Sequence, residues 1–216
     1  MVGTSNSAAK RAAKADRRKA IVAAKRKAEA AERTLAGRAA RAALLPIRHC
    51  MVSGSLFEAG MGTLLLVRGG RVGPVVTGAF LLDALCRGVT EVYVGTIEGK
   101  QLEVYLDMLE AAAPLVDIAP EYARKMLRDL VQWSGSLGFQ PHRDFTAVER
   151  LFGQVDPRAC RTEFAFGQDG KPLYLSAPYD PPSLVRRHVE QIRERLGPEG
   201  FDYIVASSSP SARRSI

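Results

Sequence analysis

The chain has 216 residues, of which 46% are hydrophobic and 25% are charged. This apolar content is enough for a folded core and excludes a wholly disordered chain. The formal net charge of +8 is unevenly distributed: residues 1–48 hold 13 Lys and Arg against 3 acids, and residues 49–216 hold 18 against 20. The net charges are therefore +10 and −2, and the basic character belongs to the N-terminal segment rather than to the whole fold.

The cysteines and the apolar segments predict the cellular compartment. Cys50, Cys86 and Cys160 are far apart and form no CxxC pair, so neither a zinc site nor a disulfide framework is predicted, and no cofactor. Unpaired cysteines are typical of proteins in the reducing cytoplasm, and we expect Cys50 and Cys86 to be buried and unreactive. The N-terminus shows no signal-peptide pattern, and the most apolar stretch, residues 75–97, is too interrupted to span a membrane.

Residues 1–45 form a basic arm that is rich in Ala, Lys, Arg and Glu, all strong helix formers. We expect a frayed, partly disordered helix, because Gly37 weakens it and few apolar residues are available to bury one face. Its cations suit the phosphates of nucleic acid, whose bound counterions they would release. The predicted phosphate-binding residues are Lys10, Arg11, Lys14, Arg17, Arg18, Lys19, Lys25, Arg26, Lys27, Arg33, Arg38 and Arg41. The alternatives are a solvated tail without a specific role and an organelle transit peptide.

Residues 46–206 are predicted to form a single α+β domain, and residues 207–216 a disordered tail. Four strands come first, and their short connections favour an antiparallel meander over βαβ crossovers. They are predicted at residues 47–53, 63–68, 75–82 and 92–97. Gly69–Arg71 is a hairpin signal between the second and third strands.

Helices dominate the next part of the chain. They are predicted at residues 101–112, from Pro120 to about Gly135 or Gly138, and in a short segment that ends at Gly153 with a capping box of Thr146 and Glu149. Strands at residues 162–166 and 172–176 flank an Asp169–Gly170 turn, followed by a helix from Pro181 to Gly197 and a strand at 201–206. This order predicts an α+β fold: a mostly antiparallel sheet with helices packed on one face.

Four segments resemble a bacterial domain family of unassigned function. They are GMGTLLLVR (60–68), GAFLLDALCRGV (78–89), SLGFQPHRDF (136–145) and FGQDGKPLYLSAPYD (166–180). The resemblance runs from about Pro46 to Ala206 and leaves out the basic arm. It implies a bacterial, cytosolic protein with one domain, and no activity or catalytic residue follows from it.

Asp83 is the most conspicuous polar residue, because it interrupts the apolar run Phe80–Leu85. A carboxylate in such a position must be paired, hydrogen-bonded or functional. It either caps a turn or acts as a metal ligand or general base at the end of a strand. His142 and Asp144 share one loop, where they would cooperate in proton transfer or metal binding unless Asp144 caps the following helix.

The remaining candidates are weaker. His49 is isolated, Asp156 and Cys160 have no further ligands in sequence, and His188 lies on an apolar helix face where a hydrogen-bonded core histidine is the usual finding. The chain contains no GxGxxG, P-loop, HExxH or GxSxG motif. An RNase-H-like nuclease with Asp83 as a carboxylate rests on analogy alone.

These observations predict a non-enzymatic protein that associates with nucleic acid through its arm, with RNA in a ribonucleoprotein favoured over DNA. The first alternative is a metal-dependent hydrolase or nuclease that uses Asp83 with His142 and Asp144. The second alternative is a protein–protein adaptor whose basic arm is incidental.

Overall fold

The computed structural model describes residues 33–205 together with Lys19, Val22, Ala23, Arg26 and Ala30. The predicted helix in the rest of the arm and the predicted disordered tail at residues 207–216 lie outside the described residues.

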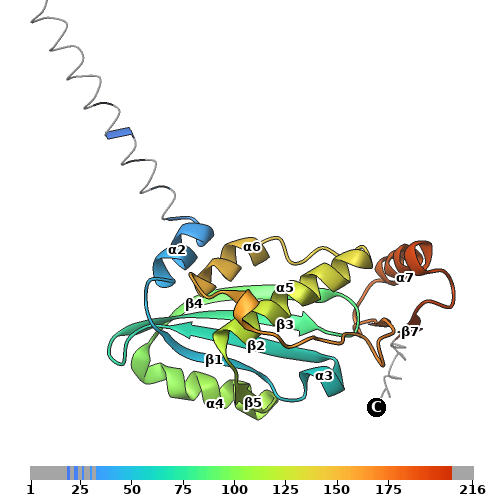
Figure 1. Ribbon diagram of the computed structural model, residues 1–216, viewed down its shortest axis with the longest axis horizontal. Helices are drawn as coiled ribbons and strands as arrows, with labels where there is room; N and C mark the ends of the chain where they lie inside the picture. Colours follow the sequence, from blue (N-terminus) through green and yellow to red (C-terminus); the bar gives the residue numbers. More distant parts are fainter. Residues whose placement is uncertain (1–18, 20–21, 24–25, 27–29, 31–32, 206–216) are drawn as a thin grey trace, which may run out of the picture.

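A five-stranded antiparallel sheet forms the centre of the molecule (Figure 1). Its strands are β1 (Ile47–Ser53), β2 (Met61–Arg68), β3 (Pro74–Asp83), β4 (Gly88–Glu98) and β5 (Leu115–Asp117). The order is β4-β3-β2-β1-β5, so β4 and β5 are the edge strands. The predicted meander is confirmed, since β1, β2 and β3 each pair antiparallel with the next strand. The short strand β5, which was not predicted, pairs with the end of β1.

Helices cover both faces of the sheet, not one as the sequence led us to expect (Figure 1). The helices are α2 (Leu35–Ala42), α3 (Leu56–Ala59), α4 (Leu102–Ala112), α5 (Pro120–Ser136), α6 (Phe145–Val148) and α7 (Pro182–Leu196). Strand β2 shows the reason, because its side chains alternate between the two faces and all are apolar from Leu64 to Val67. Leu64 and Leu66 pack under α2, α5 and α6, whereas Leu65 and Val67 pack against α4.

Three short 3₁₀ helices complete the regular structure: η1 (Gly99–Gln101), η2 (Glu149–Phe152) and η3 (Pro157–Ala159). The predicted capping box is wrong, because Thr146 lies inside α6 and the N-cap residue is Asp144. The predicted helix start at Pro120 is confirmed. None of the helices in the described part of the chain is both long and apolar enough to cross a membrane.

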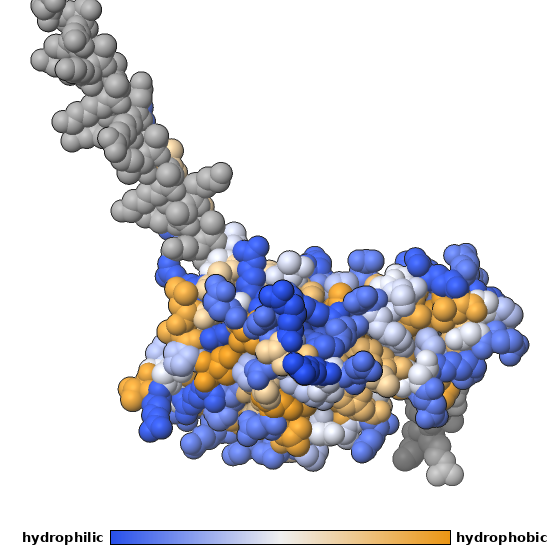
Figure 2. Space-filling model, in the orientation of Figure 1, coloured by the Kyte–Doolittle hydropathy of each residue, from blue (hydrophilic) through white to orange (hydrophobic). Residues whose placement is uncertain are grey.

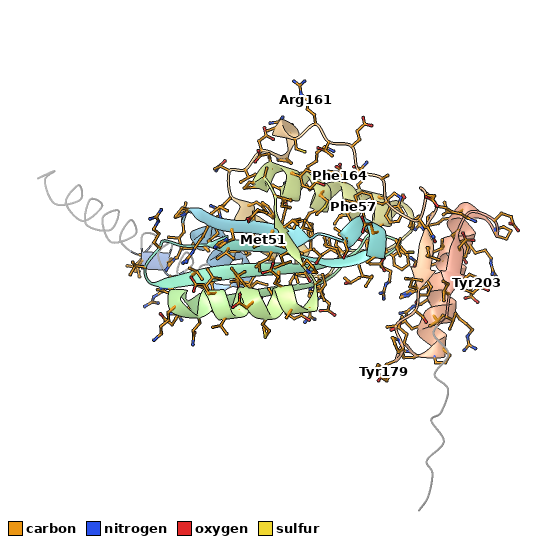
Figure 3. The ribbon with its side chains drawn as sticks, turned by 90° about the horizontal axis from the view of Figure 1, so that it is seen from below. Met51, Phe57, Arg161, Phe164, Tyr179 and Tyr203 are labelled. Carbon is orange, nitrogen blue, oxygen red and sulfur yellow. The ribbon has the colours of Figure 1, made fainter. Side chains whose placement is uncertain are left out.

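The segment 160–166 has no regular secondary structure, so the strand predicted at 162–166 is wrong. Its aromatic residues pack on helices instead of pairing in a sheet. The Phe164 ring lies 4.9 Å from that of Tyr122 and 6.1 Å from that of Phe57, and the Phe166 ring lies 5.6 Å from that of Trp133 (Figure 3). The alternating apolar residues of this segment therefore serve to pack against α3 and α5, not to form a strand.

The C-terminal part forms a second, smaller unit of packing. The Asp169–Gly170 turn is confirmed by its positive φ angles of 52° and 81°. The strand that follows, β6 (Leu173–Leu175), pairs in parallel with β7 (Asp202–Ile204), and α7 connects the two. This unit has its own core, formed by Cys86, Leu137, Phe139, Tyr174, Val185, Val189, Ile192 and Phe201. Trp133 contacts both cores and joins the unit to the body.

Helix α2 belongs to the folded body, although it lies within the segment that the sequence assigned to the arm. It begins after Thr34, whose side-chain oxygen accepts a hydrogen bond from the Gly37 amide at 3.0 Å. Ala39 and Ala42 are 0% and 4% exposed and lie in the main core. Small side chains on this face let the helix approach the core closely.

Arg68, the last residue of β2, fixes the chain just after α2. It is 6% exposed, and its guanidinium donates to the carbonyl of Leu45 at 2.6 Å and to those of Leu151 and Phe152 at 2.8 Å each. One side chain thus connects the end of β2, the segment after α2 and η2. A buried arginine is stable here because its donors meet carbonyl acceptors.

Candidate functional site

Asp83 caps a turn at the end of β3. Its carboxylate is buried, and Oδ1 accepts hydrogen bonds from the amides of Leu85 at 3.1 Å and Cys86 at 2.8 Å. Oδ2 accepts from Nε of Arg87 at 2.8 Å. Both oxygens are therefore used by the turn, as expected for a capping residue with an added ion pair. The geometry supports the turn-cap interpretation of Asp83.

His142 and Asp144 lie on a loop beside the start of β4. The His142 amide donates to the Val89 carbonyl at 2.9 Å, and the His142 Nδ1 accepts from the Asp144 amide at 3.3 Å. The Asp144 carboxylate forms only a long ion pair with Arg143, whose Nε lies 3.9 Å from Oδ2. Among the residues that the structure describes, no three His, Cys, Asp or Glu side chains gather closely enough to hold a metal ion. Asp83, His142 and Asp144 therefore do not form a metal centre, and the geometry gives no support to the hydrolase alternative.

The weaker candidates have structural partners. The His188 Nδ1 lies 3.1 Å from the Tyr174 hydroxyl, and the imidazole packs edge-on against the rings of Phe139 and Tyr174. Burial, followed by the charges of Arg187 and Arg87, lowers the pKa of His188, which favours the neutral ring. The predicted hydrogen bond is confirmed, whereas the ring is half-buried at the edge of the core rather than inside it.

Asp156 pairs with Arg158 rather than with Cys160. Its Oδ1 accepts from the Arg158 amide at 3.0 Å and from the Arg158 Nε at 3.1 Å. His49 is half-buried on β1. Neither residue contributes to a cluster of ligands in the described part of the chain.

The structure describes five of the twelve cations predicted to bind phosphate, and all five are exposed: Lys19, Arg26, Arg33, Arg38 and Arg41. The other seven, Lys10, Arg11, Lys14, Arg17, Arg18, Lys25 and Lys27, lie outside the described residues. Arg38 and Arg41 are three positions apart on α2, a spacing that places both side chains on one side of the helix. The fold therefore presents two of the arm's cations from a fixed helix.

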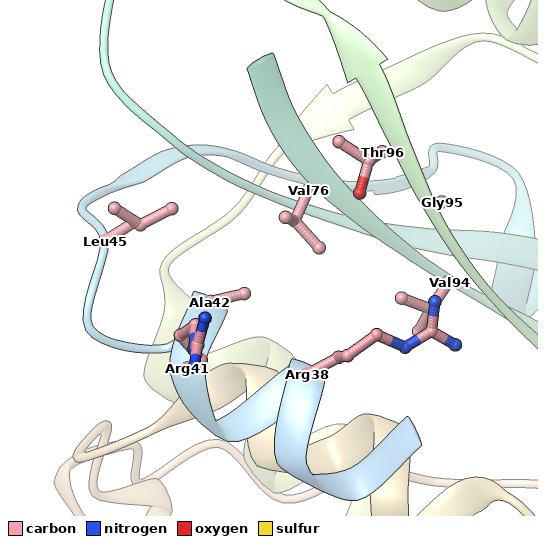
Figure 4. A pocket seen from close by; sticks show the side chains of 8 residues that line it. All are labelled: Arg38, Arg41, Ala42, Leu45, Val76, Val94, Gly95 and Thr96. Atoms are coloured by element: carbon pink, nitrogen blue, oxygen red, sulfur yellow. The ribbon is translucent and has the colours of Figure 1, made fainter. Parts of the chain in front are cut away.

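A pocket of about 330 Å³ lies between α2 and the strands β3 and β4 (Figure 4). Its lining consists of Arg38, Arg41, Ala42, Leu45, Val76, Val94, Gly95 and Thr96. Sequence reasoning identified only the two arginines. Ala42 and Leu45 lie on or just after α2, whereas Val76, Val94, Gly95 and Thr96 come from strands that are distant in sequence and that the fold alone brings next to α2.

Strand register explains why this pocket forms. Val94 and Thr96 are two residues apart on β4 and point to the same face, and Val76 on β3 is the direct partner of Thr96. This corner of the sheet is covered by α2, which offers only Ala42 and the stems of its arginines. No large apolar side chain of the described residues fills the space between them, which stays open as the pocket. Apolar side chains also reach the surface directly after α2, where Leu44 and Leu45 are 86% and 40% exposed, and Figure 2 shows apolar surface at this end of the molecule.

Many cations of the body are paired with neighbouring acids. Ion pairs join Arg87 to Asp83, Arg124 and Arg128 to Glu149, Lys125 to Asp129, Arg143 to Asp144, Arg158 to Asp156, and Lys171 to Asp202. Seven cations of the body thus have a local counter-charge. This pairing weakens the local positive potential of the body, whose net charge is −2, and leaves the arm as the main source of positive potential.

The chain was compared with known proteins at the level of families, sequences and folds. No protein-family model, curated protein or solved structure matches it. The resemblance to a bacterial domain of unassigned function therefore stays a prediction. Function has to be inferred from the charge and geometry of the chain itself.

Cys160 is expected to react with thiol reagents in the native protein, whereas Cys50 and Cys86 are not. Cys160 is only partly buried, but Cys50 and Cys86 are 5% and 0% exposed. Burial, followed by the charges of Asp117 and Glu121, raises the pKa of Cys50 to about 12. Burial, followed by the charge of Asp83, also raises the pKa of Cys86. Thiolates, the reactive species, are therefore scarce at both sites.

Titration with Ellman's reagent at mildly alkaline pH checks this expectation. One thiol should react rapidly in the native protein, and Cys160→Ser should abolish that rapid phase. All three thiols should react after denaturation. Rapid reaction of Cys50 or Cys86 without denaturant would show that the core opens readily.

Proposed function

We propose that the protein binds nucleic acid, with RNA in a ribonucleoprotein as the first candidate, and uses its basic N-terminal segment as a phosphate clamp. The observation that carries this proposal is the separation of charge. Residues 1–48 have a net charge of +10, whereas residues 49–216 have a net charge of −2. A dense row of cations releases counterions from a phosphate backbone, which favours binding without any chemical step.

The composition of the segment supports recognition of the backbone rather than of the bases. Residues 1–48 contain no Phe, Tyr or Trp that would stack on a base. We therefore expect little sequence preference. The structure adds an anchor: α2 is packed in the core through Ala39 and Ala42, and Arg68 holds the Leu45 carbonyl. The C-terminal end of the basic segment is thereby fixed to the body.

Neutralising four arm cations should weaken binding more than neutralising four cations of the body. The arm variant replaces Lys25, Arg26, Lys27 and Arg33 by Gln, and the matched control replaces the exposed Arg186, Arg187, Arg193 and Arg195 of α7 by Gln. Both variants lose the same charge, and Gln is a good helix former. If about five cations contact phosphates, log K for the unchanged protein should fall with a slope of roughly −4 to −5 against log salt. Each lost contact should reduce that slope by about 0.9.

Fluorescence anisotropy with labelled RNA and DNA of mixed sequence, measured over a series of salt concentrations, provides the slopes. The arm variant should lose most of the slope and the α7 variant should keep it. Equal losses in the two variants would contradict the clamp, and so would an absence of binding by the unchanged protein. A complementary truncation should remove residues 1–33 rather than 1–45, because deletion of α2 would expose the core around Ala39 and Ala42.

A further inference from the structure

We propose that the pocket between α2 and the strands β3 and β4 binds a small anionic amphiphile, namely an unbranched aliphatic chain that ends in a carboxylate. This site shares Arg38 and Arg41 with the proposed clamp but does not require it, because a polyanion would contact the whole row of cations along the arm. The pocket instead offers an apolar space next to two positive charges. Three features of its lining support this ligand class.

The first feature is the apolar surface of the pocket. Ala42, Leu45, Val76 and Val94 supply aliphatic groups, and Thr96 is the one hydroxyl-bearing residue of the lining. Among the described residues, no aromatic side chain lines the pocket to stack on a base or another ring. Flexible aliphatic chains adapt to such a surface, and each buried methylene adds to affinity.

The second feature is the charge at one side of the pocket. Arg38 and Arg41 both contribute to the lining, and none of its side chains in the described part of the chain is acidic. Figure 4 shows the side chain of Arg38 extending across the opening toward Val94. A guanidinium has a planar set of donors that matches a carboxylate, whereas the side chains around it are apolar. An acid group beside Arg38 would therefore place an attached chain over Val76 and Val94.

The third feature is size. A volume of about 330 Å³ is near the lower end of the range of roughly 300–1,000 Å³ for ligand pockets. Single-chain acids suit this volume better than a bulky ring system. Both arginines lie on α2, which is packed in the core through Ala39 and Ala42. The site is thus largely formed before the ligand arrives, which reduces the entropic cost of binding.

Calorimetric titration of the full-length protein with hexanoate, octanoate and decanoate, each below its critical micelle concentration, tests the proposal. Affinity should rise by about fourfold for each added methylene until the pocket is full. The alkylamine and the alcohol of the same length should bind at least tenfold more weakly than the acid, because they lack the negative charge. Methyl NMR should show shifts of Val76 and Val94 that saturate with the calorimetric binding curve.

Two variants separate the charge of the pocket from its volume. Arg38→Gln, at an exposed helical position, should weaken octanoate about tenfold without loss of folding. Val94→Phe should fill the pocket and shorten the longest acid that binds well. Arg186→Gln on α7 is the matched control and should have no effect.

Several outcomes would overturn the proposal. One is affinity that does not depend on chain length, and another is equal binding of the acid and the amine. An unchanged affinity of Arg38→Gln for octanoate would also overturn it. So would tighter binding of a nucleoside monophosphate than of any of the acids. The proposed clamp is tested by a separate measurement, namely RNA and DNA binding by the variant that lacks the charges of Lys25, Arg26, Lys27 and Arg33. A negative result there leaves the fatty-acid proposal unaffected.

Discussion

Arg68→Met should lower the free energy of unfolding by at least about 4 kcal/mol, since each of the three hydrogen bonds from the charged group contributes about 1.5–3 kcal/mol. The substitution removes the donors to three carbonyls, those of Leu45, Leu151 and Phe152. Leu151 and Phe152 have buried side chains, so the change removes partners in a closely packed region. Methionine keeps much of the apolar stem, which separates lost hydrogen bonds from lost packing.

Chemical denaturation of Arg68→Met, Arg68→Lys and Arg150→Met measures this effect. Arg68→Lys should have an intermediate loss, because it keeps the charge but lacks the planar set of donors. Arg150 is exposed on the neighbouring η2 and is the matched control, with an expected change within about 0.5 kcal/mol. Similar midpoints for Arg68→Met and Arg150→Met would show that the three carbonyls find other partners.

Asp83→Ala should cost about 3 kcal/mol of folding free energy, a value near the lower end for breaking a buried ion pair. The Asp83 side chain is 2% exposed and that of Arg87 is 20% exposed. Because the arginine is partly solvated, the ion pair contributes less to stability than a fully buried pair would. The alanine variant also leaves the amides of Leu85 and Cys86 without their acceptor. Asp83→Asn should cost less, about 1–2 kcal/mol, because it can still accept from those amides.

Asp156 provides a matched control, because it forms a similar cap and ion pair with Arg158 at the protein surface. Asp156→Ala should have a much smaller effect than Asp83→Ala. Thermal melts of the unchanged protein and of Asp83→Asn with Mg²⁺, Mn²⁺ and Zn²⁺ complete the test. We expect no metal-dependent shift that needs Asp83, and such a shift would revive the metal-dependent hydrolase.

Local signals in the sequence predicted much of the fold. Proline fixes φ, so Pro120 marks the start of a helix. The Asp169–Gly170 turn has the left-handed backbone that this pair favours. The strands of the meander are adjacent in sequence, and short connections leave few ways to pair them. In each of these cases the determining residues are neighbours along the chain.

The features that the sequence did not reveal depend on distant partners. Residues 162–166 have a strand-like pattern, but Phe164 and Phe166 pack on helices. The apolar side of α2 consists mainly of alanines, whose burial follows from the position of the helix against the core rather than from hydrophobicity. The sequence identified Asp83 as unusual, whereas its pairing with Arg87 required the geometry of the turn. The pocket beside α2 combines three separate segments and has no local signature.

The free edge of β4 has a consequence for self-association. The loop that contains His142 covers the first residues of this strand, but no further strand of the described structure pairs with its outer side. Antiparallel pairing of two copies centred on Glu91, or on Glu98, would place that glutamate of one copy directly opposite the same glutamate of the other. Like charges directly opposite each other oppose such pairing. Two exposed acids thus disfavour these two registers of pairing between copies, while leaving the edge open to a strand with basic side chains at the matching positions.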